Sequence, residues 1–343
     1  MANYYSDHPE IEFHLNHPLM KRVVDLKERN YAEKDQFEDA PVNYEDAIEN
    51  YKRLLDITGD VAANIIEPNS EDVDLEGPHL ENGRMIYASK TFENLDATRK
   101  AGLWGLSMPR RYGGLNLPNA IFSMASEIIA AADAGFQNIW SLQSCIDTLY
   151  EFGSEEQRQK YIPRICAGET MSMDLTEPDA GSDSAAVRTT AVRKGDSYVI
   201  NGTKMFITNA SLASVFLVVA TLDPSKGSKG LATFIVEKDR PGVTVGKKIE
   251  KIGMRLSNTA EVIFDNVEIP AFNLIGTEEG GFANAMKVLT ASRPIIAASS
   301  LGACQLARDL AIQYSKERIA FGKPICAKQM IQEKIANMEM LIQ

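Results

Sequence analysis

Two short runs of the sequence contain residue types that can bind a flat ring system with polar edges. The runs are 173–183 (MDLTEPDAGSD) and 204–209 (KMFITN). The hydroxyls of Thr176 and Thr208 can hydrogen-bond the edge of a heterocycle, and Phe206 can pack on its face. Gly181 permits close backbone approach, and Ser182 can reach a phosphate or an amide. Together the runs predict a binding site for such a heterocycle.

Taken singly, the same residues are also typical of a surface loop, because Thr, Gly and Ser are common in turns. A third run, 317–325 (ERIAFGKPI), follows near the end of the chain. In this order the three runs resemble the acyl-CoA dehydrogenase family, and the likeness covers the chain from about residue 90 onward. The resemblance implies FAD as the cofactor, an acyl-CoA thioester as the substrate and a helix–sheet–helix architecture.

The resemblance also implies a set of cofactor contacts. These are Leu175, Thr176, Gly181, Ser182, Phe206, Thr208, Arg318, Phe321 and Gln329. Arg318 suits the pyrophosphate and Phe321 the adenine of an FAD bound by a neighbouring subunit, which implies a homodimer or homotetramer. From the residues alone, the alternative for Arg318 is a solvated helix residue lying over Tyr314, one turn back.

Substrate contacts and an electron acceptor follow from the same resemblance. Ser182, Arg255 and Arg293 are the expected contacts to the coenzyme A part, and Arg293 is also expected to support catalysis. For both arginines, an ordinary solvated position is the alternative. We expect dehydrogenation to an enoyl-CoA, of a cyclic or aromatic-pathway acyl group among others, with electrons passed to an electron-transfer flavoprotein. The alternatives are an oxygen-using flavin enzyme on the same fold and an inactive scaffold.

The catalytic base is the missing part of this prediction. Dehydrogenation beside a thioester needs a base for the α-proton, a hydride acceptor and donors for the thioester oxygen. In most relatives the base is a Glu in a segment that would follow residue 343. In others it is a Glu directly before the position of Arg293, but Ser292 occupies that place here.

Asp147 is a candidate base of a different kind. It lies beside Ile146 and Leu149 in a segment that lines the acyl pocket in relatives. A carboxylate among apolar side chains has a raised pKa and can accept a proton. The alternative is an Asp on the solvent side of a helix. Asp174 is a weaker candidate, because it alternates with Leu175 and is expected to point away from the flavin.

Composition limits the other classes of function. The net charge is −11 and no basic stripe is evident, which argues against general nucleic-acid binding. The four cysteines are widely spaced and the histidines lack ligand-like spacing, so we expect free thiols and no metal site. The first 20 residues are polar, and no stretch approaches 18 apolar residues. We therefore expect no signal peptide, no membrane span and a cytoplasmic location.

The residue pattern predicts an α+β fold. We expect an N-terminal extension (1–60), a helical domain (61–170), an antiparallel β domain (171–280) and the start of a C-terminal helical bundle (281–343). Helices are expected over 61–66 and 121–132, and a loop or hairpin over 70–90 around Asn82 and Gly83. Strands are expected at 189–193, 198–200, 215–220, 231–236 and 261–264. The chain ends inside an amphipathic pattern, so we expect an incomplete bundle and a fragment of a longer protein.

Overall fold

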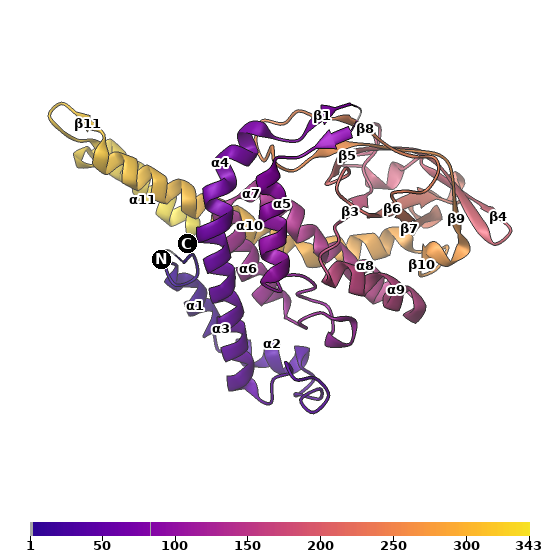
Figure 1. Cartoon of the computed structure of the whole chain (residues 1–343), viewed down its shortest axis with the longest axis horizontal. Helices are drawn as coiled ribbons and strands as arrows, with labels where there is room; N and C mark the ends of the chain where they lie inside the picture. Colours follow the sequence, from indigo (N-terminus) through magenta and orange to yellow (C-terminus); the bar gives the residue numbers. More distant parts are fainter. Residues whose placement is uncertain (1–2, 83) are drawn as a thin grey trace.

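Along the sequence, the chain forms a helical N-terminal region, a sheet and a projecting helical arm, with the sheet and the arm on opposite sides of the molecule (Figure 1). The computed structural model describes residues 3–82 and 84–343. The first helices are α1 (Pro9–Leu15), α2 (Met20–Lys27), α3 (Tyr44–Val61) and α4 (Glu67–Glu76), with the π-helical turn η1 (Ala62–Ile66) between α3 and α4. The helix predicted over 61–66 is therefore part of a longer helical stretch. Likewise, α3 runs through residue 60, where we expected the extension to end.

A second group of helices completes this region. It consists of α5 (Ser89–Lys100), η2 (Arg110–Tyr112), α6 (Asn119–Ala132), α7 (Ala134–Trp140), η3 (Ser141–Ile146), α8 (Asp147–Phe152) and α9 (Glu155–Cys166). The helix predicted over 121–132 is confirmed, and its side chains Ile121, Phe122 and Ile129 are fully buried. The hairpin predicted within 70–90 is present as β1 (His79–Glu81) and β2 (Arg84–Ile86), and Gly83 lies outside the described residues. The predicted bounds are too wide, because α4 continues to residue 76 and α5 begins at residue 89.

The middle domain is an eight-stranded sheet. Its strands are β3 (Met171–Asp174), β4 (Thr190–Lys194), β5 (Ser197–Thr208), β6 (Val215–Thr221), β7 (Leu231–Glu237), β8 (Val243–Lys248), β9 (Thr259–Pro270) and β10 (Leu274–Ile275). The order is β10-β7-β6-β4-β5-β9-β8, and β3 pairs with β6. All predicted strands are confirmed. The expectation of an antiparallel sheet is wrong at two pairings, because β3 and β4 each run parallel to β6.

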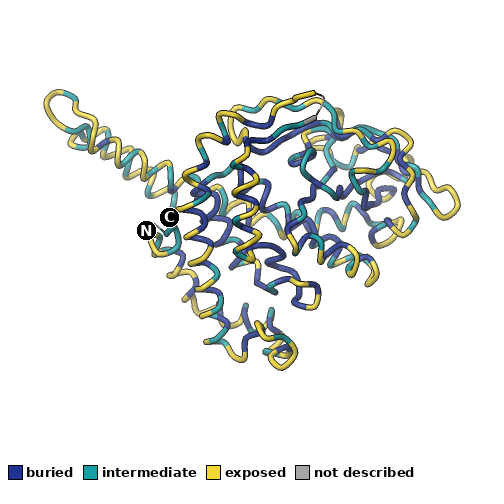
Figure 2. Tube along the Cα trace, in the orientation of Figure 1, coloured by how far each residue is buried: buried dark blue, intermediate teal, exposed yellow. Residues whose placement is uncertain are grey.

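The arm is formed by α10 (Gly281–Glu317), the hairpin β11 (Ile319–Ala320) and β12 (Lys323–Pro324), and α11 (Gln329–Ile342). It is anchored where α10 crosses α6. A Cβ added at Gly302 would lie 2.1 Å from the Glu127 carbonyl oxygen, so only glycine permits this approach. The Gln305 amide donates to the Glu127 carboxylate at 2.9 Å. Figure 2 shows the arm mostly exposed beyond this crossing, in contrast to the buried centre.

One helix, α10, bears on the expectation that the chain has no membrane span. By length and composition alone, α10 is the one helix in the described part of the chain that could cross a membrane, and 22% of its apolar window is buried. The expectation considered only uninterrupted runs of apolar residues. In α10 small residues interrupt the apolar ones, but the mean hydropathy of the helix is still high. The core helix of a soluble protein passes the same test, so this is weak evidence for a membrane span.

A buried ionic contact fastens α2 to the rest of the helical domain. Arg110 donates through two nitrogens to Glu28, at 2.8 and 3.1 Å, and approaches Glu33 at 3.4 Å. The side chains of Arg110 and Glu28 are only 4% and 2% exposed. Asn116 adds a hydrogen bond to Glu28 at 3.3 Å.

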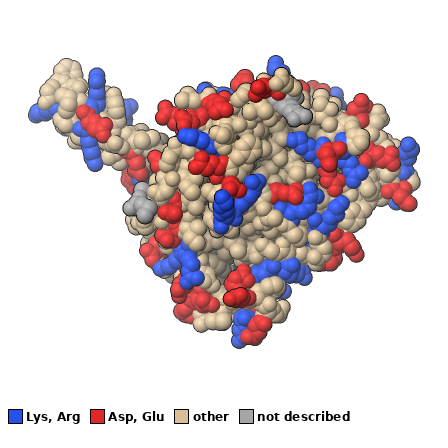
Figure 3. Space-filling view, viewed as in Figure 1, with Lys and Arg blue, Asp and Glu red and all other residues tan. Residues whose placement is uncertain are grey.

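At the surface, charges are mixed in sign, and the face shown in Figure 3 carries acidic and basic side chains interspersed.

We predict that Arg110→Met destabilises the protein by about 3–5 kcal/mol, because it leaves Glu28 buried without its cation. Urea unfolding at pH 7 measures the change in free energy of unfolding. The matched control is Arg111→Met at the neighbouring position, where the side chain is 51% exposed. A loss at Arg110 no larger than at Arg111 would show that the buried contact does not stabilise this region.

Candidate active site

The structure brings the two sequence runs together. The first run continues from strand β3 into a loop, and the second forms the end of β5. The Met205 amide donates to the Thr176 carbonyl oxygen at 2.8 Å, and the Lys204 ammonium donates to the Leu175 carbonyl oxygen at 3.1 Å. Residues predicted to contact the same ring system therefore lie on adjacent backbones.

Lys204 and Glu177 form an ion pair beneath these backbones. Their side chains are 0% and 6% exposed, and the ammonium lies 2.8 Å from the Glu177 carboxylate. The Arg188 amide donates to Oε2 of this carboxylate at 2.7 Å, and the Thr189 amide donates at 2.9 Å to Oε1, the oxygen that Lys204 also contacts. Burial opposes its ionisation, but the Lys204 charge and these donors hold the pKa of Glu177 below its ordinary value. The pair holds the two runs in register.

Phe206 occupies an unusual backbone conformation. Its φ is +60°, a left-handed value that is strained for an aromatic residue, and its side chain is 57% exposed. The residue lies within a pairing irregularity of β5 against β9, between Lys204 and Ile207. Strain of this kind persists where the surroundings fix it and is common at ligand sites. The exposed ring is available to cover one face of a flat ligand.

The polar groups around Phe206 suit a heterocycle edge. In residues 3–82 and 84–343, the hydroxyls of Thr176 and Thr208 make no hydrogen bond, although both residues are partly buried. Gly181 borders open space, since an added Cβ there would have no atom within 4 Å. Ser182 is exposed on the same loop. Free donors, an exposed ring and an open backbone segment fit a dinucleotide flavin.

Asp174 points into the sheet interior. It is 0% exposed, one carboxylate oxygen accepts from Ser172 at 2.5 Å, and the other has no partner among the described residues. Burial raises the pKa of Asp174 to about 7, opposed by the Ser172 hydrogen bond and by the charge of Lys204.

Asp147 lies at the start of α8, and Cys145, two residues before it, is within electrostatic range of both Asp147 and Asp174 of the first run. Its carboxylate accepts a hydrogen bond from the Ser107 hydroxyl at 3.1 Å. Burial raises the pKa of Asp147 to about 6, opposed by that hydrogen bond and by the Lys27 ammonium. The neighbouring side chains Ile146 and Leu149 pack in an apolar cluster that reaches the sheet at Met171. The surroundings are thus apolar on one side and charged on the other.

The third run lies at the tip of the arm, remote from β3 and β5 (Figure 1). Arg318 and Gln329 are exposed, and Phe321 is 94% exposed with φ at +54°. The Lys328 ammonium lies 5.3 Å from the centre of the Phe321 ring. Within one chain these residues cannot act on a ligand held by Thr176 and Phe206.

The two predicted coenzyme A cations differ in their surroundings. The Arg255 guanidinium donates to Asp74 at 2.6 and 2.9 Å, and the Arg255 amide donates to the same carboxylate at 2.9 Å. Arg293 is exposed on α10. Arg255 is therefore held by a carboxylate, whereas Arg293 faces solvent.

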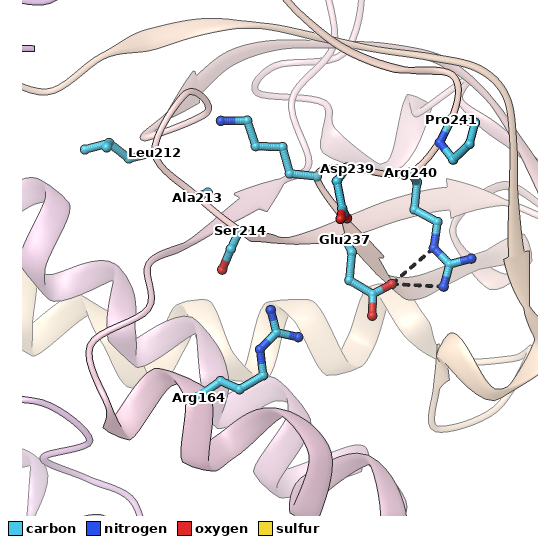
Figure 4. Close-up of a pocket in the computed structure, with 9 residues that line it drawn as sticks. Arg164, Leu212, Ala213, Ser214, Glu237, Asp239, Arg240 and Pro241 are labelled. Atoms are coloured by element: carbon cyan, nitrogen blue, oxygen red, sulfur yellow. Dashed lines mark hydrogen bonds and ion pairs between the residues drawn. The ribbon is translucent and has the colours of Figure 1, made fainter. Parts of the chain in front are cut away.

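A large open cavity lies elsewhere, against α9 and the ends of β6 and β7 (Figure 4). Its volume is about 870 Å³, and Arg164, Lys238 and Arg240 line it with Glu237. The cations do not converge on the open space, because each has another partner. Arg240 donates to Glu237 at 3.1 Å, Arg164 pairs with Glu169 at 2.8 Å, and Lys238 donates to the Ser211 carbonyl oxygen. None of the predicted site residues lines this cavity.

The sequence interpretation missed Lys204 and Glu177. A signal was present, because Tyr198 and Ile200 face the sheet interior and Lys204 follows them at even spacing. A lysine at an inward position of a strand requires a buried carboxylate partner. Glu177, three residues after Asp174 in the first run, is that partner.

Comparison with known proteins agrees with this architecture. Family models match the acyl-CoA dehydrogenase N-terminal domain at residues 49–169, the middle domain at 172–267 and the C-terminal domain at 279–343. An acyl-CoA dehydrogenase of Bacillus subtilis (strain 168) is 42% identical over 250 residues, which are 72% of this chain and 66% of that protein.

Two further similarities cover more of the chain. Cyclohex-1-ene-1-carbonyl-CoA dehydrogenase of Geobacter metallireducens is 38% identical over 293 residues, 84% of this chain and 74% of that protein. A solved structure from work on the electron transferring flavoprotein of Acidaminococcus fermentans has a TM-score of 0.79 and 37% identity, covering 85% of this chain and 75% of that one. The chain thus spans 66% to 75% of these proteins.

The three matched domains occur in the order of the observed helical, sheet and helical regions. The paired runs lie in the middle domain, where Thr176, Phe206 and Thr208 fit a flavin. The chain belongs to the acyl-CoA dehydrogenase family, whose members are FAD-dependent oxidoreductases.

Proposed function

We propose that this chain dehydrogenates an acyl-CoA thioester to an enoyl-CoA and passes the electrons to an electron-transfer flavoprotein. The observation that carries the proposal is the pairing of the two runs by Lys204, which presents Thr176, Phe206 and Thr208 together. The similarity to a solved structure from work on an electron transferring flavoprotein supports the acceptor. The protein is expected to act in the cytoplasm.

Leu175, Thr176, Phe206 and Thr208 would hold the flavin ring, and Gly181 and Ser182 would border its polar parts. Bound FAD would accept a hydride from the carbon next to the one that loses its proton. The chain itself must position the thioester and remove the proton. Ser182, Arg255 and Arg293 are the proposed contacts to coenzyme A, with Arg255 shared between its phosphates and Asp74.

Asp147 is the proposed proton acceptor. A partly buried carboxylate with a pKa of about 6 is largely ionised at pH 7 and remains a useful base. The name of the Geobacter metallireducens relative includes a cyclic acyl group, which supports an alicyclic acyl-CoA as substrate. The α-proton or a ring proton would move to Asp147.

We propose that Arg318, Phe321 and Gln329 complete the FAD site of a second copy. Their distance from β3 and β5 within one chain supports this assignment, and so does the exposure of Phe321. A guanidinium suits a pyrophosphate and an aromatic ring suits adenine. The assembly is then a homodimer or a dimer of dimers.

We predict that Phe206→Gly weakens FAD binding about tenfold or more, equivalent to about 1.4 kcal/mol. Without FAD the variant should be at least as stable as the wild type, because glycine adopts the left-handed conformation without strain. FAD titration by fluorescence and thermal unfolding of the apoprotein measure the two effects. Val192→Ala, which trims an exposed apolar side chain on β4, is the control. Unchanged FAD affinity, or FMN as the bound cofactor, would contradict the assignment.

We predict that Asp147→Asn lowers turnover by on the order of a hundredfold, because the amide keeps the shape and cannot accept the proton. Anaerobic bleaching of the flavin by a panel of acyl-CoA thioesters, alicyclic ones included, measures the rate. Asp35→Asn, the same substitution at an exposed position, is the control. A change within about twofold at unchanged flavin content, about 0.4 kcal/mol, would show that Asp147 is not the base. The absence of bleaching by every thioester in wild-type protein would contradict the dehydrogenase function itself.

We predict that Arg318→Ala lowers FAD affinity at least tenfold although Arg318 is remote from β5 in its own chain, because the charge-assisted contact to the pyrophosphate is lost. Lys316→Ala, at an exposed position two residues earlier, is the control. Light scattering during the titration gives the mass of the FAD-loaded species. A flavin-loaded monomer would contradict the shared site.

A further inference from the structure

A chain of hydrogen bonds connects the N-terminal helix α2 to Asp147. The Lys27 ammonium donates to the Ser107 carbonyl oxygen at 2.9 Å. The Ser107 hydroxyl donates to the Asp147 carboxylate at 3.1 Å. One residue thus joins a cation and a carboxylate that come from segments far apart in the sequence.

Lys27 is held in this position by its neighbours. The next residue, Glu28, is fixed to Arg110 at 2.8 Å, and the Asn116 amide donates to the Lys27 carbonyl oxygen at 3.3 Å. Met20 and Val24 bury the other face of α2 in the helical core. The backbone that carries Lys27 is therefore tied on both sides to the segment that contains Ser107.

Lys27 and Asp147 are opposite charges that stabilise each other electrostatically without direct contact. No carboxylate of the described residues lies within 4.0 Å of the Lys27 ammonium, and burial lowers the pKa of Lys27. Asp147 and Glu28 favour its charge, with Glu151 as a weaker contribution, whereas Arg110 opposes it. Asp147 in turn faces Lys27, Ser107, Cys145 and Glu151.

The segment that carries Lys27 is also outside the matched family domains. The N-terminal family match begins at residue 49, whereas α2 ends at residue 27. The link from α2 to α8 is therefore made by a part of the chain that the family domains do not include.

We propose that Lys27 is a positioning residue for Asp147, so that the segment before residue 49 takes part in the active site by keeping the Asp147 carboxylate ionised and oriented through Ser107. This inference rests on the proposed role of Asp147 as proton acceptor. It assigns the N-terminal segment a role in the reaction in addition to its packing.

The sign of the effect follows from the charges. A cation near a carboxylate lowers the pKa of the carboxylate, so loss of Lys27 raises the pKa of Asp147 further, by on the order of one unit. If the reaction needs ionised Asp147, the rate of the variant then begins to fall at a higher pH than the rate of the wild type when the pH is lowered. The rate should fall about fivefold at pH 6 and change little at pH 8.5, where Asp147 is ionised in both proteins.

The first measurement is the pH dependence of kcat/KM in the FAD-loaded protein, with the best thioester found. Lys27→Met removes the positive charge and Lys27→Arg retains it. Ser107→Ala removes the hydroxyl that donates to Asp147. Lys21→Met is the matched control, because Lys21 lies on the same helix and pairs at 2.8 Å with Asp25 at the surface. We expect Lys27→Met to move the acid limb upward by about one pH unit, and Lys27→Arg and Lys21→Met to leave it within about 0.3 unit.

The second measurement does not depend on turnover. Because burial raises the pKa of Asp147 above its unfolded value, the contribution of Asp147 to the free energy of unfolding falls as the pH rises from about 4 to about 6. Lys27→Met should enlarge that loss between pH 4 and pH 8, and the enlargement should vanish in an Asp147→Asn background. Urea unfolding of the four proteins of this cycle measures the coupling.

The two measurements separate the possible failures. Coupling together with a shifted acid limb supports the proposal. Equal pH dependence of stability with and without Lys27 overturns the link between the two residues. Coupling with an unmoved acid limb overturns the role of Lys27 in the reaction. If Asp147→Asn is also still active, Asp147 is not the base, while the rest of the proposed function stands.

Discussion

The cofactor site depends most directly on the ion pair between Lys204 and Glu177. Both charges are taken out of water, so either one alone would be costly in the sheet interior. Because Lys204 also binds the Leu175 carbonyl oxygen, the pair fixes the loop after β3 against the end of β5. The strained backbone at Phe206 can persist only in surroundings that are held this firmly.

Buried charged side chains in different parts of the chain differ in how close their opposite charges lie. Arg110 and Glu28 neutralise each other at the joint between α2 and η2. Asp174 has no such cation within 4.0 Å among the described residues, and its raised pKa leaves it largely protonated below pH 7. Lys27 and Asp147 are intermediate, since they act on each other through Ser107 without direct contact. A partner at close range fixes structure, whereas a partner at longer range leaves the carboxylate able to titrate.

Apolar periodicity was sufficient to predict α6 and the main strands, because it reports which faces are buried. It could not give the direction of strand pairing, and the parallel pairings of β6 were missed for that reason. The partners of Arg255 and Asp147 were also unpredictable, because Asp74 and Ser107 come from distant parts of the sequence. Family resemblance supplied the flavin runs and the arm residues. The sequence alone did not show that Lys204 joins those runs.

The crossing of α10 and α6 at Gly302 makes α10 a lever. About 23 Å of helix separates this pivot from the end of α10, just before the hairpin that carries Phe321, at 1.5 Å per residue. A tilt of about 5° at the pivot therefore displaces the tip by about 2 Å, most of the length of a hydrogen bond. A methyl group at Gly302 would not act on packing alone, because it would also change where the tip of the arm is aimed. The missing side chain of one glycine thus sets the reach of residues several helical turns away.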